Sequence, residues 1–139
     1  MHTLTKLWLL TVLLVGSVAV SADAVTDKRI LVDAYLAVWS EQDPNKRQAQ
    51  LAQLFVVDGV HQSPTTHSVG YEAIGEEIEA FQQRFPGASV TATNLLMTKN
   101  HLVFNFSLTD AAGNPIVSGI DYVKLSVNGS KIEKVVGFY

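Results

Sequence analysis

Apolar residues recur at helical spacing in three segments of the first two thirds of the chain. In 27–41 they recur every three or four residues, at Ile30, Leu31, Ala34, Tyr35, Val38 and Trp39. Asp43 followed by Pro44 is typical of a helix start, and a shorter helix follows to about Phe55. A third helix is predicted over 71–84 by the stripe Ile74, Ile78, Phe81 and Phe85, which ends at a Pro-Gly pair.

The rest of the chain alternates apolar and polar residues, as strands do. The segment 56–63 is extended and stops at Pro64, and four strands are expected at 90–97, 101–109, 115–127 and 131–139. Asn128-Gly129 predicts a two-residue hairpin between the last two strands. Helices first and antiparallel hairpins afterwards predict a single α+β domain.

The alternation also predicts which strand face is buried. The set that should face the helices in 101–109 is Leu102, Phe104, Phe106 and Leu108. The corresponding set in the next strand, Val117, Gly119, Asp121, Val123, Leu125 and Val127, contains one carboxylate. A carboxylate on an apolar face must be neutral, hydrogen-bonded or next to a cavity. Asp121 is therefore the strongest candidate for a functional residue, although capping a loop or pairing with a lysine would explain it equally well.

Further polar groups accompany the apolar stripes. Tyr35 and Trp39 lie four residues apart on the first helix, and their polar tips need partners if they are buried. Each fits simple core filling, but together with Asp121 they would form the polar end of an apolar cavity. His61 and Ser63 share one face of the segment 56–63, where a histidine could act as a base or bond to a backbone carbonyl.

Other chemistries find little support in the sequence. His61 and His67 have no acidic or cysteine residue beside them at ligand spacing, so no metal site is expected, and His67 should be exposed in a polar loop. No phosphate-binding loop or nucleophile elbow occurs, and no cofactor is expected. We interpret one acidic run as the solvated face of the third helix: Glu72, Glu76, Glu77 and Glu79.

The first 24 residues are typical of a cleavable signal peptide. Lys6 precedes the apolar run 7–15, and small residues follow it, so cleavage is expected after Ala22 or Ala24. The apolar run is too short to span a membrane. These features predict a periplasmic or secreted domain over 25–139, without membrane contact after cleavage. The net charge of −3 and the scattered lysines and arginines argue against a nucleic acid partner.

Several motifs resemble the nuclear transport factor 2-like superfamily, particularly its SnoaL-like and ketosteroid isomerase-like members. The resemblance covers 27–139 and is carried by Ala34-Tyr35-Leu36 with Trp39, Leu51-Ala52-Gln53-Leu54-Phe55, Val60-His61-Gln62-Ser63-Pro64, Gly70-Tyr71-Glu72-Ala73-Ile74-Gly75, Gly119-Ile120-Asp121 and Asn128-Gly129-Ser130-Lys131-Ile132. It implies a cystatin-like, cone-shaped roll, in which a curved antiparallel sheet wraps N-terminal helices around a deep pocket. It also implies a homodimer formed through the sheet face.

The same resemblance implies roles for individual residues. Tyr35 is similar to the isomerase tyrosine that donates a hydrogen bond to the substrate oxyanion, and Asp121 is similar to the protonated carboxylic acid that helps it. Where the isomerase pattern has a carboxylate before the proline, this chain has Ser63, which cannot move a proton alone. His61 could substitute, or Asp121 could itself be the acid and base, as in SnoaL-like cyclases.

Two functional hypotheses follow, and whether the protein is an enzyme stays open between them. In the first, an exported protein binds a small apolar, carbonyl-containing molecule in a pocket lined by Trp39, Ser63, Phe81, Phe104 and Phe106. In the second, it is a cofactor-free isomerase or cyclase whose working residues are Asp121, Tyr35 and His61.

Overall fold

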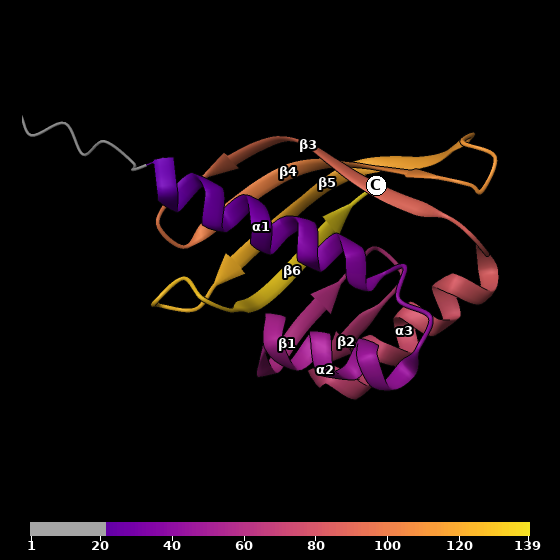
Figure 1. Cartoon of the computed structure of the whole chain (residues 1–139), viewed down its shortest axis with the longest axis horizontal. Helices are drawn as coiled ribbons and strands as arrows, with labels where there is room; N and C mark the ends of the chain where they lie inside the picture. The colour runs from indigo at the N-terminus through magenta and orange to yellow at the C-terminus, as the bar shows by residue number, and fades with distance from the viewer. Residues whose placement is uncertain (1–21) are drawn as a thin grey trace, which may run out of the picture.

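Three helices cover the inner face and one end of a curved six-stranded sheet (Figure 1). The computed structural model describes residues 22–139, with side chains from residue 27 onward, so most of the predicted signal peptide lies outside the described residues. The elements are α1 (Ala22–Val38), α2 (Pro44–Leu54), β1 (Phe55–Gln62), β2 (His67–Val69), α3 (Gly70–Arg84), β3 (Ser89–Met97), β4 (His101–Thr109), β5 (Pro115–Leu125) and β6 (Ile132–Phe138). Within this part of the chain, no helix has the length and apolar character that a membrane span requires.

The strand order in the sheet is β2-β1-β6-β5-β4-β3. All neighbours are antiparallel except β1 and β6, which run parallel with His61 opposite Val135. The predicted α+β roll is confirmed, and the sheet is mixed where only antiparallel pairs were expected. Between β1 and β6 the chain forms β2, α3 and the strands β3 to β5. This long connection allows β6 to lie beside β1 in the same direction, which a short hairpin turn could not do.

Two helix boundaries show why the elements begin and end where they do. The Asp43 carboxylate accepts hydrogen bonds from the backbone N–H groups of Asn45 and Lys46 at 2.9 and 3.2 Å, which satisfies the first turn of α2. The helix α1 ends at Val38 and not at the expected residue 41, because the next residues close tighter turns, with the Ser40 N–H bonded to the Ala37 carbonyl at 3.0 Å.

The structure corrects two predictions about the strand ends. Residues 67–69 form the short strand β2 paired with β1, although a loop was predicted; His67 is exposed, as expected. The turn between β5 and β6 is longer than two residues, because the Ser126 N–H bonds to the Lys131 carbonyl at 2.8 Å. Val127 therefore lies in the turn and is 82% exposed, not on the buried strand face.

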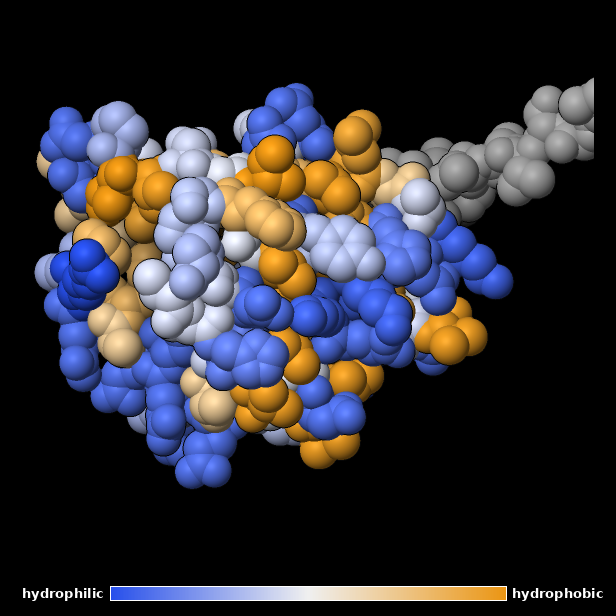
Figure 2. Space-filling model, turned by 180° about the vertical axis from the view of Figure 1, so that it is seen from behind, coloured by the Kyte–Doolittle hydropathy of each residue, from blue (hydrophilic) through white to orange (hydrophobic). Residues whose placement is uncertain are grey.

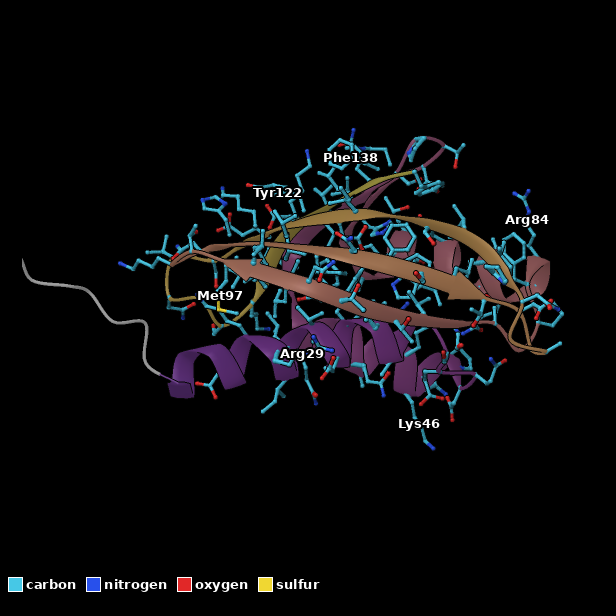
Figure 3. The ribbon with its side chains drawn as sticks, turned by 90° about the horizontal axis from the view of Figure 1, so that it is seen from above. Arg29, Lys46, Arg84, Met97, Tyr122 and Phe138 are labelled. Atoms are coloured by element: carbon cyan, nitrogen blue, oxygen red, sulfur yellow. The ribbon has the colours of Figure 1, made fainter. Side chains whose placement is uncertain are left out.

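The core lies between the inner sheet face and the helices. The predicted inward set on β4 is buried as expected, and α1 contributes Val32, Leu36 and Val38 to the same cluster. Figure 3 views the sheet edge-on, with α1 below it and the labelled side chains Tyr122 and Phe138 on the opposite, outer face. The sheet thus has one buried face and one open face.

Candidate functional site

A cavity of about 860 Å³ opens between α1, α3 and the inner face of the sheet. It brings together seven of the predicted site residues: Tyr35, Trp39, His61, Ser63, Phe81, Phe106 and Asp121. Phe104 does not line it, because its side chain is fully buried in the core. A smaller hollow of about 480 Å³ near Asp27, Lys99 and Asn128 contains none of these groups.

His61 is held in the cavity wall by a carboxylate from α3. Its Nδ1 lies 3.0 Å from Glu77 Oε1, and the side chains are only 8% and 11% exposed. An ionised carboxylate accepts hydrogen bonds and cannot donate them, so Nδ1 carries the proton. The other ring nitrogen, Nε2, has no partner among the described residues and is not enclosed by protein. It is therefore the ring atom that is open to the cavity.

The polar groups around Glu77 keep it ionised. Burial alone would raise the pKa of this carboxyl, but the hydrogen bond and charge of His61, the hydrogen bond from Thr66 and the nearby Ser68 hydroxyl lower it below its ordinary value. The Thr66 hydroxyl donates to Oε1 at 2.6 Å, so this one oxygen accepts two hydrogen bonds, while Oε2 is buried without a partner in the described part of the chain. Glu77 is thus a fixed anion behind the histidine ring.

Asp121 has the opposite electrostatic character. Burial raises its pKa to about 6, and this rise is only partly opposed by the charge of His61 and by the neighbouring Tyr35 hydroxyl. Burial together with the charge of Asp121 raises the pKa of Tyr35 well above 10, so this phenol keeps its proton. The pair offers a hydroxyl donor beside a carboxyl that titrates close to neutral pH.

The strand β6 sets the distance between His61 and Asp121. It lies between β1 and β5, with Val135 opposite His61 and Gly137 opposite Asp121. A Cβ atom on Gly137 would come within 3.1 Å of Asp121 Oδ1, which is a tight contact. The glycine therefore leaves room for the carboxyl on the inner face, and the two titratable groups face the same cavity from strands that do not touch.

Aromatic rings complete the apolar wall of the cavity. The indole of Trp39 packs edge-on against Phe81, with ring centroids 5.3 Å apart, and lies 5.0 Å from the His61 ring. Phe106 packs against Tyr139 in the same edge-on manner, at 5.9 Å. This wall suits an apolar ligand body whose polar atom reaches the tyrosine, histidine and aspartate at one end.

Sequence reasoning missed Glu77, which it assigned to the solvated face of α3. The other three members of the acidic run are exposed, but Glu77 is mostly buried because it points to the sheet side of the helix. The signal was present in the sequence. Glu77 is three residues after Ile74 and four before Phe81, so it lies on the same apolar stripe. Thr66 was likewise treated as part of a polar loop.

No group of three potential metal ligands occurs among the described residues. The side chains that face the cavity are hydrogen-bonding and acid–base groups and aromatic rings, so the arrangement can bind a polar atom and move a proton.

Comparisons with known proteins give matches among solved structures. A SnoaL-like family protein from Agrobacterium tumefaciens, which is named as an isomerase, is 29% identical, with a TM-score of 0.75 over 81% of this chain and 97% of that one. A protein from Jannaschia, named as a SnoaL-like polyketide cyclase, is 14% identical over 81% of this chain and 85% of its own, with a TM-score of 0.66.

A third similar structure is a protein with a ketosteroid isomerase-like fold from Catenulispora acidiphila, in complex with trimethylamine. It is 19% identical, with a TM-score of 0.60 over 78% of this chain and 84% of that chain. No protein-family model matches the sequence, and the search of curated proteins gave no match. The likenesses under 25% identity establish the fold, and the observed site rests on the geometry of this chain.

Proposed function

The chain belongs to the nuclear transport factor 2-like superfamily, and we propose that it binds an apolar, carbonyl-containing small molecule and moves a proton on it. One observation carries this proposal. A histidine that is fixed by an ionised carboxylate presents its free nitrogen to an apolar cavity that also holds Tyr35 and Asp121. The structural neighbours named as isomerase and cyclase support the same class of chemistry.

Ser63 stands where the isomerase pattern has its carboxylate base, and a serine alone cannot move a proton. His61 lies two residues earlier on the same strand face, and its contact with Glu77 supplies what a neutral histidine needs to act as a base. We therefore assign the base to His61, in place of the residue before the proline. This placement supports the isomerase or cyclase hypothesis over simple binding.

The reaction we propose is proton transfer next to a carbonyl group. His61 Nε2 takes a proton from the carbon beside the carbonyl, and the electron pair left behind moves onto the carbonyl oxygen. The Tyr35 hydroxyl and the protonated form of Asp121 donate hydrogen bonds to that oxygen, where negative charge develops. For isomerisation, the imidazolium then returns the proton to another carbon. For cyclisation, the enolate carbon attacks a second carbonyl, and the alkoxide that forms there takes the proton from the imidazolium.

Hydrogen–deuterium exchange at carbon tests this proposal without knowledge of the product. Apolar enones and diketones are incubated with the protein in D₂O, and exchange beside the carbonyl is followed by NMR. We expect the wild type to accelerate exchange, and His61→Gln to reduce the rate by about 10²- to 10⁴-fold, the usual contribution of a positioned base. His67→Gln is the matched control, because His67 is exposed on β2 and does not line the cavity.

Two results would contradict the catalytic proposal. One is exchange that His61→Gln and His67→Gln leave equally fast. The other is the absence of exchange with ligands that nevertheless raise the melting temperature, which would leave a binding protein in place of an enzyme.

The location of the protein is a separate part of the proposal. We propose that it is exported, because residues 1–24 have the charge and apolar pattern of a cleavable signal. N-terminal sequencing of the protein from the producing cells tests this. Mature chains that begin at Asp23 or Val25 are expected, and a chain that retains Met1 would contradict export by cleavage.

We further propose that two copies associate through the outer face of the sheet. This face mixes apolar and polar side chains (Figure 2), and Ile120 and Phe138 are 45% and 57% exposed on it. Light scattering of the purified protein should give a dimer mass. A Phe138→Lys variant should shift that mass toward the monomer, and a monomeric wild type would contradict the proposal.

A further inference from the structure

We infer that Ser63 and Thr66 are positioning residues that fix the tautomer of His61 through Glu77. This inference rests on the proposed function, because it explains how the base of that reaction is prepared. The two hydroxyls lie in the turn between β1 and β2, and they form a continuous hydrogen-bonded chain with the carboxylate and the imidazole. Ser63 occupies the position where the isomerase pattern has its base, yet its contacts give it another task.

The groups at the two ends of this hydrogen-bonded series determine which group donates in each hydrogen bond. The Ser63 hydroxyl oxygen accepts backbone N–H groups from Thr65 and Thr66 at 3.3 and 3.1 Å. A hydroxyl has two acceptor positions and one proton, so Ser63 has only its proton left to give. That proton goes to the Thr66 hydroxyl oxygen at 2.8 Å. Ser63 therefore has no lone pair left with which to accept a proton from a ligand.

The Thr66 hydroxyl donates its own proton to Glu77 in the same direction along the series. Its hydroxyl accepts from Ser63 and donates to Glu77 Oε1 at 2.6 Å, a short hydrogen bond of the kind that charged acceptors make. The same oxygen is 3.0 Å from His61 Nδ1. Because Oε1 is held from one side by the turn, it stays in line with Nδ1 and keeps the proton on that nitrogen. The backbone of the turn thus determines which nitrogen of His61 is free.

The groups that face His61 from the neighbouring elements favour the same state. Glu77 on α3 is the anion at Nδ1, Asp121 on β5 faces the ring across the cavity, and Tyr35 on α1 packs at 6.5 Å between ring centroids. Only Glu77 makes a direct hydrogen bond to the imidazole within the described residues. If the Glu77 carboxylate is no longer held in place, the His61 tautomer protonated on Nε2 becomes more populated.

Nitrogen NMR of histidine-labelled protein tests this inference separately from activity, because the two ring nitrogens have different shifts in each tautomer. We expect His61 in the neutral wild type to carry its proton on Nδ1. Thr66→Val should raise the population of the Nε2-protonated tautomer about fivefold, the factor that corresponds to one hydrogen bond. Ser63→Ala should change it in the same direction by less, and Thr66→Ser should restore the wild-type spectrum because it keeps the hydroxyl.

Thr65→Val is the matched control, because it makes the same substitution in the same turn. Among the described residues, Thr65 contributes only its backbone N–H to this series of hydrogen bonds. This variant should leave the tautomer unchanged. A wild-type His61 protonated on Nε2, an unchanged tautomer in Thr66→Val, or an equal effect in Thr65→Val would overturn the inference. If the tautomer responds as expected but no carbonyl compound is turned over, the positioning role stands and the proposed catalytic function fails.

Discussion

Two buried carboxylates face the same cavity and behave in opposite ways. Glu77 on α3 accepts hydrogen bonds from His61 and Thr66 at 3.0 and 2.6 Å, and its pKa is lowered although burial acts against it. Asp121 on β5 is also largely buried, its anion is favoured only by Tyr35 and by the charge of His61, and its pKa is raised to about 6. Burial sets the direction of a carboxyl pKa only where hydrogen-bond donors are few.

Because of this difference, the two carboxyl groups have different chemical roles in the cavity. A carboxylate with several donors is a permanent anion and can hold a histidine in one orientation. A carboxyl with few donors stays close to its protonation midpoint near neutral pH and can give or take a proton. Acid-to-amide substitutions at the two positions remove one ionisable group each at almost constant volume, so they test the comparison directly.

The largest effect is expected for Asp121→Asn. In the wild type, Asp121 is protonated when folded but ionised when unfolded between about pH 4 and pH 6, so stability falls as pH rises through this window. A pKa raised from 3.8 to about 6 corresponds to a contribution of about 3 kcal/mol to the unfolding free energy at low pH. This contribution is absent above pH 6. Relative to the wild type, Asp121→Asn should therefore gain up to about 3 kcal/mol in unfolding free energy from pH 4 to pH 8.

Urea unfolding of both proteins at pH 4, 6 and 8 measures this gain. A constant difference between the two proteins across this range would show that Asp121 does not titrate abnormally in the folded state.

A smaller effect of opposite sign is expected for Glu77→Gln. The amide loses the charge that strengthens two hydrogen bonds, and its nitrogen would replace the buried, unpartnered Oε2. We expect a loss of about 2 kcal/mol at pH 7. Because the pKa of Glu77 is lowered on folding, its contribution is complete above about pH 4.5 and disappears as the pH falls through the folded-state pKa.

Urea unfolding at pH 7 and pH 3 tests this prediction, and the deficit of the variant should shrink at the lower pH. A variant as stable as the wild type at pH 7 would mean that the hydrogen bonds to Glu77 do not depend on its charge.

The smallest effect is expected for Glu133→Gln, which removes a partly exposed carboxylate that does not line the cavity. Glu133 is paired with Lys124 at 2.7 Å, but the side chains are 31% and 51% exposed. Exposed ion pairs are screened by water and contribute little. The urea midpoint should stay within experimental error of the wild type. A clear loss would show that a partner alone, without burial, stabilises a carboxylate here.

The sequence predicted the parts of the site that depend on strand alternation and helix periodicity. Asp121 was found because it interrupts an apolar strand face, and Tyr35 and Trp39 because they lie on an apolar helix stripe. Their common cavity followed from the resemblance in motif order. Strand alternation and helix periodicity are local patterns, so one segment of the sequence is enough to reveal each of these residues.

The remaining parts depend on contacts between distant segments. Glu77 lies on the apolar stripe of α3, but its neighbours in the acidic run made a solvated face the simpler interpretation. The parallel pair of β1 and β6 leaves no local pattern, because each strand alone fits an antiparallel hairpin equally well. Ser63 was predicted to line the pocket, but the hydrogen bonds that lead from Ser63 through Thr66 to Glu77 arise only because the turn 63–66 lies against α3 in space.

The position of β6 also bears on the order of folding. His61 and Asp121 belong to strands that are joined only through β6, the last of the described strands in chain order. Contacts between segments far apart in a chain form late, since a long loop must close first. A short turn joins β6 to β5, whereas β6 meets β1 only across the segment 63–131. We therefore expect the base and the acid to come together when β1 and β6 pair, because this pairing closes the longest loop in the sheet.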